Sequence, residues 1–96
     1  MLGKIDYSQL PEHMQEAARL YLEHGVRPGD FLTSVICNDL FGAMGRADCV
    51  NQQRMFDICS FFYNEAPSGS YGSEEKMSNW MFSKRSYEVS KEEEGE

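Results

Sequence analysis

The chain has 96 residues, with 16 Asp and Glu against 9 Lys and Arg, which gives a formal net charge of −7. This length corresponds to one domain, and a hydrophobic content of 41% is enough for a core, so disorder of the whole chain is not expected. The negative charge argues against direct binding to nucleic acid phosphates or to an anionic membrane surface, and no apolar run approaches the ~18 residues of a membrane span.

The first predicted helix begins in the segment from Ser8 to Glu12 and ends at His24. Ser8 is a suitable cap, Pro11 is tolerated in the first turn, and Gly25 is a typical residue to end a helix. At about 100° per residue, one face collects its apolar side chains, namely Leu10, Met14, Ala17, Ala18 and Tyr21.

The second predicted helix covers residues 31–44 and is apolar on nearly all sides. Such a helix is expected to be central in the domain or to pack on another subunit as well. Asn38 and Asp39 lie in its middle, where burial without partners would cost a few kcal/mol. Two interpretations stay open: these residues cap or bridge neighbouring helix ends, or they line an interface or a small-ligand pocket.

The third predicted helix covers residues 49–65, with Asp48 as its cap. Met55, Ile58, Cys59, Phe62 and Tyr63 form the expected inner face, and Phe61 falls on the polar side. A loop over 66–72 contains Tyr71. Ser73 is the expected cap of a fourth helix, on which Phe82 lies roughly opposite the face that contains Trp80.

Residues 88–96 contain a single apolar residue and carry five acids and one Lys, a net charge of −4, whereas residues 1–87 carry eleven acids and eight Lys and Arg, a net charge of −3. We therefore predict an all-α fold of about four helices in one domain, residues 1–87, followed by an acidic disordered tail, residues 88–96.

Neither a catalytic nor a metal site is indicated. His13 and His24 are eleven residues apart on one helix, about 16 Å, which is too far to share a metal ion. Cys37, Cys49 and Cys59 form no C-x-x-C pair and are expected to be small buried hydrophobic residues. We predict no enzyme activity, no metal and no cofactor. The odd cysteine count and a start without an apolar signal core favour the cytoplasm.

Aromatic residues outside the expected inner faces are the best indication of a binding function. Phe61, Tyr71 and Phe82 fall on a polar face, in a loop or opposite an apolar face, and exposed aromatics commonly mark partner surfaces. Together with Asn38 and Asp39 they form the predicted partner-binding set, although the aromatics could instead belong to the core if the helical phases are shifted by a residue.

A series of short motifs resembles a family of small proteins from phages and prophages. The motifs are Ile5 to Gln15, Tyr21 to Gly25, Pro28 to Thr33, Asn38-Asp39-Leu40, Gly45 to Asp48 and Tyr63 to Gly69, so the resemblance covers about residues 5–82. The family has no established biochemical role. The resemblance implies a viral or mobile-element source and expression in bacterial cytoplasm.

The function predicted first is therefore non-catalytic binding to a host protein, as in a counter-defence inhibitor of the anti-CRISPR kind. The second hypothesis is a homo-oligomer that binds a small ligand and associates through residues 31–44. The third is a helical DNA-binding regulator, and it depends only on the run Asn51-Gln52-Gln53-Arg54.

Overall fold

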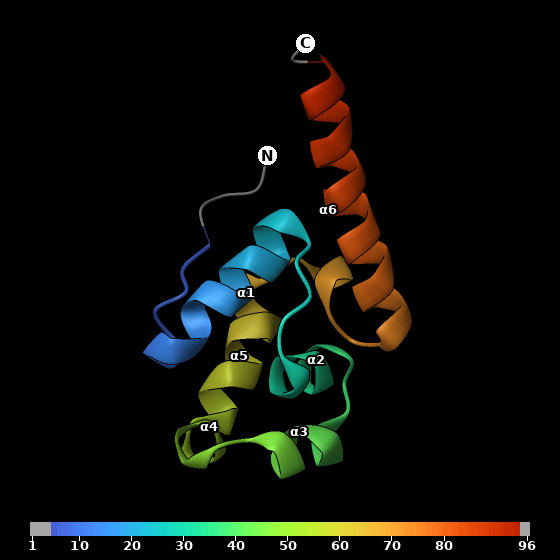
Figure 1. Ribbon diagram of the computed structural model, residues 1–96. Helices are drawn as coiled ribbons and strands as arrows, with labels where there is room; N and C mark the ends of the chain where they lie inside the picture. Colours follow the sequence, from blue (N-terminus) through green and yellow to red (C-terminus); the bar gives the residue numbers. More distant parts are fainter. Residues whose placement is uncertain (1–4, 95–96) are drawn as a thin grey trace.

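A computed structural model describes residues 5–94, and the side chains of residues 5–85. Within this range the chain forms six α-helices, one short 3₁₀ helix and no strand, so the all-α prediction is confirmed. The elements are α1 (Glu12–His24), α2 (Asp30–Ile36), α3 (Leu40–Arg46), α4 (Cys49–Gln53), α5 (Met55–Glu65), η1 (Ser68–Ser70) and α6 (Glu74–Glu94). Figure 1 shows α6 beside α1, with its C-terminal half projecting beyond the other helices.

The predicted count of four helices is wrong because two of the predicted helices are each divided in two. The helix predicted over 31–44 ends at Ile36, since Asn38 adopts a left-handed conformation with φ 65°. The Asp39 N–H then bonds back to the Ser34 carbonyl at 2.8 Å, which is the pattern of a helix C-terminus. The Asp39 side chain accepts from the Gly42 N–H at 3.0 Å and so begins α3. The interpretation as a helix cap is therefore confirmed for Asp39, whereas Asn38 supplies the left-handed turn between the two helices.

The second division occurs at Arg54, between α4 and α5. Its backbone, at φ −107° and ψ 16°, leaves the helical region for one residue. The Arg54 guanidinium bonds to the Asp57 carboxylate at 2.7 Å and to the Gln9 carbonyl at 2.8 Å. The break is thus held by a side chain that ties this corner to the segment before α1.

Three of the predicted helix ends are confirmed. Gly25 ends α1 with φ 72°, the Asp48 side chain accepts from the Asn51 N–H at 2.7 Å to begin α4, and the Ser73 hydroxyl accepts from the Lys76 N–H at 3.1 Å to begin α6. Ser8 does not cap α1. It lies in a turn before the helix, where its N–H donates to Asp6 Oδ1, and Pro11 occupies the cap position.

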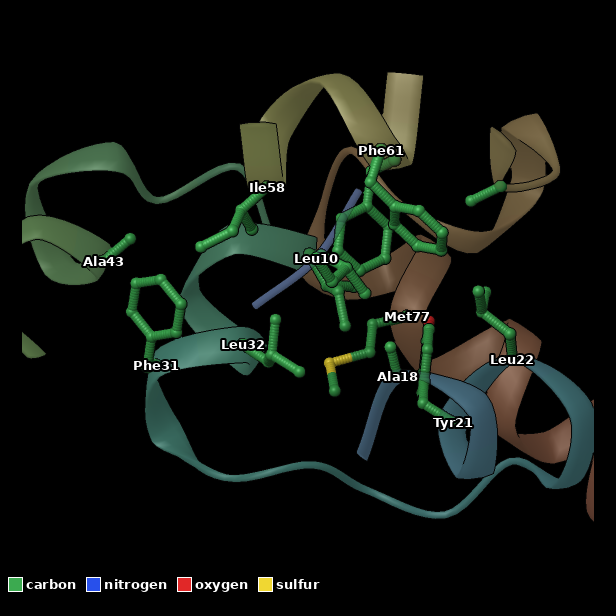
Figure 2. Packing of buried hydrophobic residues seen from close by; sticks show 13 residues of the cluster. Leu10, Ala18, Tyr21, Leu22, Phe31, Leu32, Ala43, Ile58, Phe61 and Met77 are labelled. Atoms are coloured by element: carbon green, nitrogen blue, oxygen red, sulfur yellow. The ribbon is translucent and has the colours of Figure 1, made fainter. Parts of the chain in front are cut away.

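The core lies between α1, α2, α5 and the first turns of α6 (Figure 2). Leu10, Ala18 and Tyr21 are buried as the sequence predicts, and the Tyr21 hydroxyl donates to the Ser70 carbonyl at 2.7 Å. α6 docks on α1 through the Trp80 indole, which donates to the Leu22 carbonyl at 3.3 Å. A Cβ at Gly25 would lie 2.8 Å from the Met81 carbonyl oxygen, so this glycine allows the close approach of α6.

The helix α6 continues to Glu94, past residue 87, where the sequence analysis places the end of the helical domain. Residues 88–94 belong to both this helix and the predicted tail, and Gly95 and Glu96 lie outside the described residues. No helix in the described part of the chain is both long and apolar enough to cross a membrane.

Candidate functional site

The most distinctive feature of the surface is a groove between α5 and the connection from α2 to α3. It has two adjoining lobes, with volumes of about 50 Å³ and 240 Å³, which share Val35, Asn38 and Cys59. We call it the α2–α5 groove. The smaller lobe adds Asp39, Leu40, Ala43 and Met55, and the larger lobe adds Phe62, Tyr63 and Tyr71.

The groove exists because the chain breaks at Asn38. If residues 31–44 formed one helix, Asn38 and Leu40 would continue along its axis. The left-handed turn at Asn38 instead redirects α3, so that Leu40 and Ala43 face Met55 and Cys59 across the smaller lobe. The left-handed turn at Asn38 and the cap at Asp39 thus shape an apolar depression.

Large exposed apolar side chains are concentrated on α3, α4 and α5, and two of them, Leu40 and Tyr63, line the groove. Six of the eight large hydrophobic residues that the described structure leaves exposed lie between positions 40 and 63. We call them the outer apolar surface; they are Leu40, Phe41, Met44, Val50, Phe56 and Tyr63. On α5, Phe56, Cys59 and Tyr63 follow the i, i+3, i+7 spacing that places side chains in one row. Phe56 therefore lies on the same side of α5 as Cys59 and Tyr63, although it lines neither lobe.

The predicted partner-binding residues divide into two groups. Asn38, Asp39 and Tyr71 meet at the groove, although the sequence places them on two different elements. Tyr71 is only partly exposed, with its ring centroid 6.2 Å from that of Phe62. Phe82 is exposed as predicted, at 73%, but lies on α6 and does not line the groove.

Phe61 is a correction, because the side chain predicted to be exposed is 0% exposed. Its ring packs on Tyr7, at 5.5 Å between centroids, and edge-on against Phe62 at 5.1 Å. Tyr7 belongs to the segment before α1, for which no packing role was predicted. The observed inner face of α5 is rotated accordingly, so that Tyr63, predicted to be inside, is 78% exposed.

The cysteines also differ from the prediction that they are buried. Cys49 and Cys59 are exposed, and Cys37 is partly buried. Partial desolvation against the groove raises the pKa of the Cys59 thiol above its ordinary value of 9.0. A thiol of this kind stays protonated at neutral pH and is a poor nucleophile.

A second, polar depression of about 270 Å³ lies where α2, α3 and the start of α6 meet. It is lined by Arg27, Asp30, Thr33, Ser34, Cys37, Asp39, Arg46 and Glu74. Its charges are mixed, with two guanidinium groups and three carboxylates, and Arg46 already donates to the Ser34 hydroxyl at 3.0 Å. This mixture selects neither an anion nor a cation.

The four residues that suggested DNA binding, Asn51 to Arg54, do not form a shared exposed surface. Asn51 is 3% exposed, and its side-chain amide donates to the Met14 sulfur at 3.6 Å. Arg54 bonds to Asp57 and Gln9, and Gln52 donates to the Ala47 carbonyl at 3.2 Å. Three of the four side chains are therefore engaged in hydrogen bonds within the protein. Among the described residues, no group of three or more His, Cys, Asp or Glu is arranged to hold a metal ion.

Comparison with protein-family models, with curated proteins and with solved structures finds no match. The resemblance to small phage proteins therefore stays a prediction from the sequence, and the candidate site has to be argued from its own geometry.

Proposed function

We propose that this protein binds another protein through the α2–α5 groove and the outer apolar surface. The observation that supports this most strongly is the concentration of six exposed large hydrophobic residues on α3, α4 and α5. A concentration of exposed large hydrophobic residues on one part of a protein commonly marks an interaction site. Aromatic and Met side chains, which include Phe41, Met44 and Phe56 here, are enriched in protein interfaces.

A protein partner fits this site better than a small molecule. Pockets for drug-sized ligands usually enclose about 300–1,000 Å³ and bury most of the ligand. The two lobes have volumes of about 50 Å³ and 240 Å³ and lie beside exposed side chains rather than beneath them. Such lobes suit the anchoring side chains of a larger partner.

Binding is also a better proposal than catalysis at this site. The residues that line the groove with titratable side chains are Asp39, Cys59, Tyr63 and Tyr71. Asp39 is engaged in capping α3, and the raised pKa of Cys59 keeps its thiol protonated at neutral pH. These groups support recognition rather than acid–base or nucleophilic chemistry.

We further propose that the partner is a bacterial host protein and that binding modulates it, as in a counter-defence inhibitor. The support for this finer statement is the resemblance of residues 5–82 to small phage proteins, together with the acidic charge of −7, which favours an encounter with basic proteins.

The test uses a photo-crosslinking amino acid introduced separately at positions 56, 63 and 82 in bacterial host cells. We expect adducts from positions 56 and 63 that contain one defined protein, and that protein, once purified, should bind the unmodified chain. Phe82 is equally exposed but lies outside the groove, so it serves as the comparison position.

Two outcomes would overturn the proposal. Adducts from position 82 alone would move the binding surface to α6. Adducts of twice the chain's own mass from positions 56 and 63 would show self-association, as the homo-oligomer hypothesis requires, and not a separate partner.

A further inference from the structure

We propose that the polar depression between α2, α3 and the start of α6 binds a small zwitterion of the free α-amino acid class. This inference concerns a different site from the α2–α5 groove and goes beyond the proposed function, so either can fail without the other. It follows from charges of both signs that line one depression without pairing with each other.

Three of the charged side chains that line the depression come from separate elements. Arg27 belongs to the connection between α1 and α2, Asp30 begins α2 and Glu74 begins α6. Within the part of the chain that the structure describes, none of the three takes part in an ion pair. Opposite charges that line the same depression without pairing can each be paired by one ligand that carries both signs.

The second guanidinium of the depression is held in place by a buried hydroxyl. Ser34 is 6% exposed, and its hydroxyl accepts from Arg46 Nη1 at 3.0 Å. A guanidinium has five N–H donors, so Arg46 keeps others with which it can bind a carboxylate. Arg27 and Arg46 therefore supply the carboxylate side of the site, and Asp30 and Glu74 supply the ammonium side.

Cys37 lines the depression on the side of the core. Its thiol donates to the Met77 sulfur at 3.6 Å, and Met77 is buried. Burial raises the pKa of the Cys37 thiol, the Glu74 carboxylate raises it further, Arg27 lowers it and Asp39 raises it. Charges of both signs thus act on the same thiol, as they would on a ligand beside it.

The volume and the charges of the depression select the class of ligand. Its volume of about 270 Å³ is below the about 300–1,000 Å³ that is usual for drug-sized ligands, so the ligand is smaller. A simple anion would meet the carboxylates of Asp30 and Glu74, and a simple cation would meet the guanidinium groups of Arg27 and Arg46. A zwitterion places each of its charges beside the opposite one, which makes both contacts favourable.

The experiment measures the alkylation of Cys37 by iodoacetamide at about pH 8 as L-glutamine is added. Cys37, Cys49 and Cys59 lie in three different tryptic peptides, so mass spectrometry follows each thiol separately. Two analogues complete the set of ligands: 4-aminobutanamide lacks the carboxylate of glutamine, and glutaramate lacks its ammonium group. The backbone amide NMR shifts of Thr33 and Ser34 give a second reading that does not depend on the thiol.

We expect L-glutamine at about 1–10 mM to slow the alkylation of Cys37 by at least about threefold. Alkylation of Cys49 and Cys59 should not change, because neither residue lines the depression. Neither analogue should protect Cys37 at the same concentration, since each can pair only one of the two kinds of charge.

Two variants remove one side of the site each. Arg27→Gln and Glu74→Gln should each raise the glutamine concentration for half protection by at least about fivefold. Both side chains are exposed, so the fold should be kept. Glu75→Gln is the matched control, because Glu75 is an exposed carboxylate in the same first turn of α6 but does not line the depression. It should protect Cys37 as the original chain does.

Protection by either analogue equal to that by glutamine would overturn the inference, and so would unchanged protection in both Gln variants of the depression. The absence of both Cys37 protection and saturable amide shifts would overturn it as well. Crosslinking from positions 56 and 63 tests the groove separately, so a failure there leaves this site in place, and a failure here leaves the proposed function in place.

Discussion

Two faces of α5 show how the same residue type serves opposite purposes. Phe61 and Phe62 are 0% and 2% exposed and hold α5 against the core, whereas Phe56 and Tyr63 on the other face are 81% and 78% exposed. The two faces differ because other segments of the chain cover one of them and leave the other exposed. Tyr7 and Tyr71 cover the inner face, and no described segment covers the outer one to a comparable extent.

The largest expected effect is a difference in the free energy of unfolding between substitutions on these two faces. Phe61→Ala should lower the free energy of unfolding by about 3–5 kcal/mol, because it leaves a cavity against Tyr7 and Phe62. Phe56→Ala removes a ring that is mainly in water and should change it by less than about 0.5 kcal/mol. Urea denaturation followed by circular dichroism measures both. Similar losses for the two variants would contradict the assignment of the faces.

Two glycines, one at a close contact and one in open space, allow the same comparison of buried and exposed positions for the backbone. Gly25→Ala should lower the free energy of unfolding by about 1–3 kcal/mol, since φ is 72° and the new Cβ would meet the Met81 carbonyl of α6. Gly45→Ala on the outward-facing α3 meets no atom within 4 Å and should be neutral or stabilise the protein by up to about 1 kcal/mol. Thermal unfolding of the two variants tests this, and a stabilising Gly25→Ala would refute the close approach of α6.

A smaller effect is expected at the buried hydroxyl of Tyr21. Tyr21→Phe removes its bond to the Ser70 carbonyl and should cost about 1 kcal/mol. Burial raises the pKa of Tyr21 above its ordinary value of 10.0. The folded state therefore holds this proton more tightly than the unfolded state, so stability is complete below pH 10 and falls as the pH rises above it. Urea midpoints measured between about pH 8 and 11 should decline less in Tyr21→Phe; an equal decline would show that Tyr21 does not contribute to the pH dependence.

The smallest effect is expected from truncation after Tyr87. Residues 88–96 carry a net charge of −4, and the earlier turns of α6 dock on the core through Met77 and Trp80. The truncated chain should keep its free energy of unfolding within about 0.5 kcal/mol. A larger loss would show that the end of α6 belongs to the cooperative domain, and that the boundary at residue 87 is misplaced.

The local signals in the sequence predicted the helix ends better than the helix count. Gly25, Asp48 and Ser73 act through bonds to their near neighbours, so their roles are visible in a short window. The breaks at Asn38 and Arg54 were missed for different reasons. Asn38 takes a conformation that Asn tolerates but does not require. Arg54 is held by Gln9, which is 45 residues away in the sequence.

The candidate site was predicted in part. Asn38 and Asp39 were predicted as site residues because they are polar residues in an apolar segment, and Tyr71 because it is an aromatic residue in a loop. All three line the groove. Phe61 was misassigned because the packing of Tyr7 cannot be inferred from α5 alone. The exposed row of Phe56, Cys59 and Tyr63 was missed for the same reason, since a rotation of the helix by about one residue moves Phe61 inward and Tyr63 outward.

The docking of α6 on α1 has a consequence for how the chain folds during synthesis. The Tyr21 hydroxyl bonds to Ser70, 49 residues later, and the Leu22 carbonyl accepts from Trp80, 58 residues later. The ribosome must therefore produce most of the chain before α1 has its partners, and until then the apolar face of α1 is available to chaperones or to other nascent chains. Because Trp80 lies in α6, we expect the completed core to form only after α6 has left the ribosome.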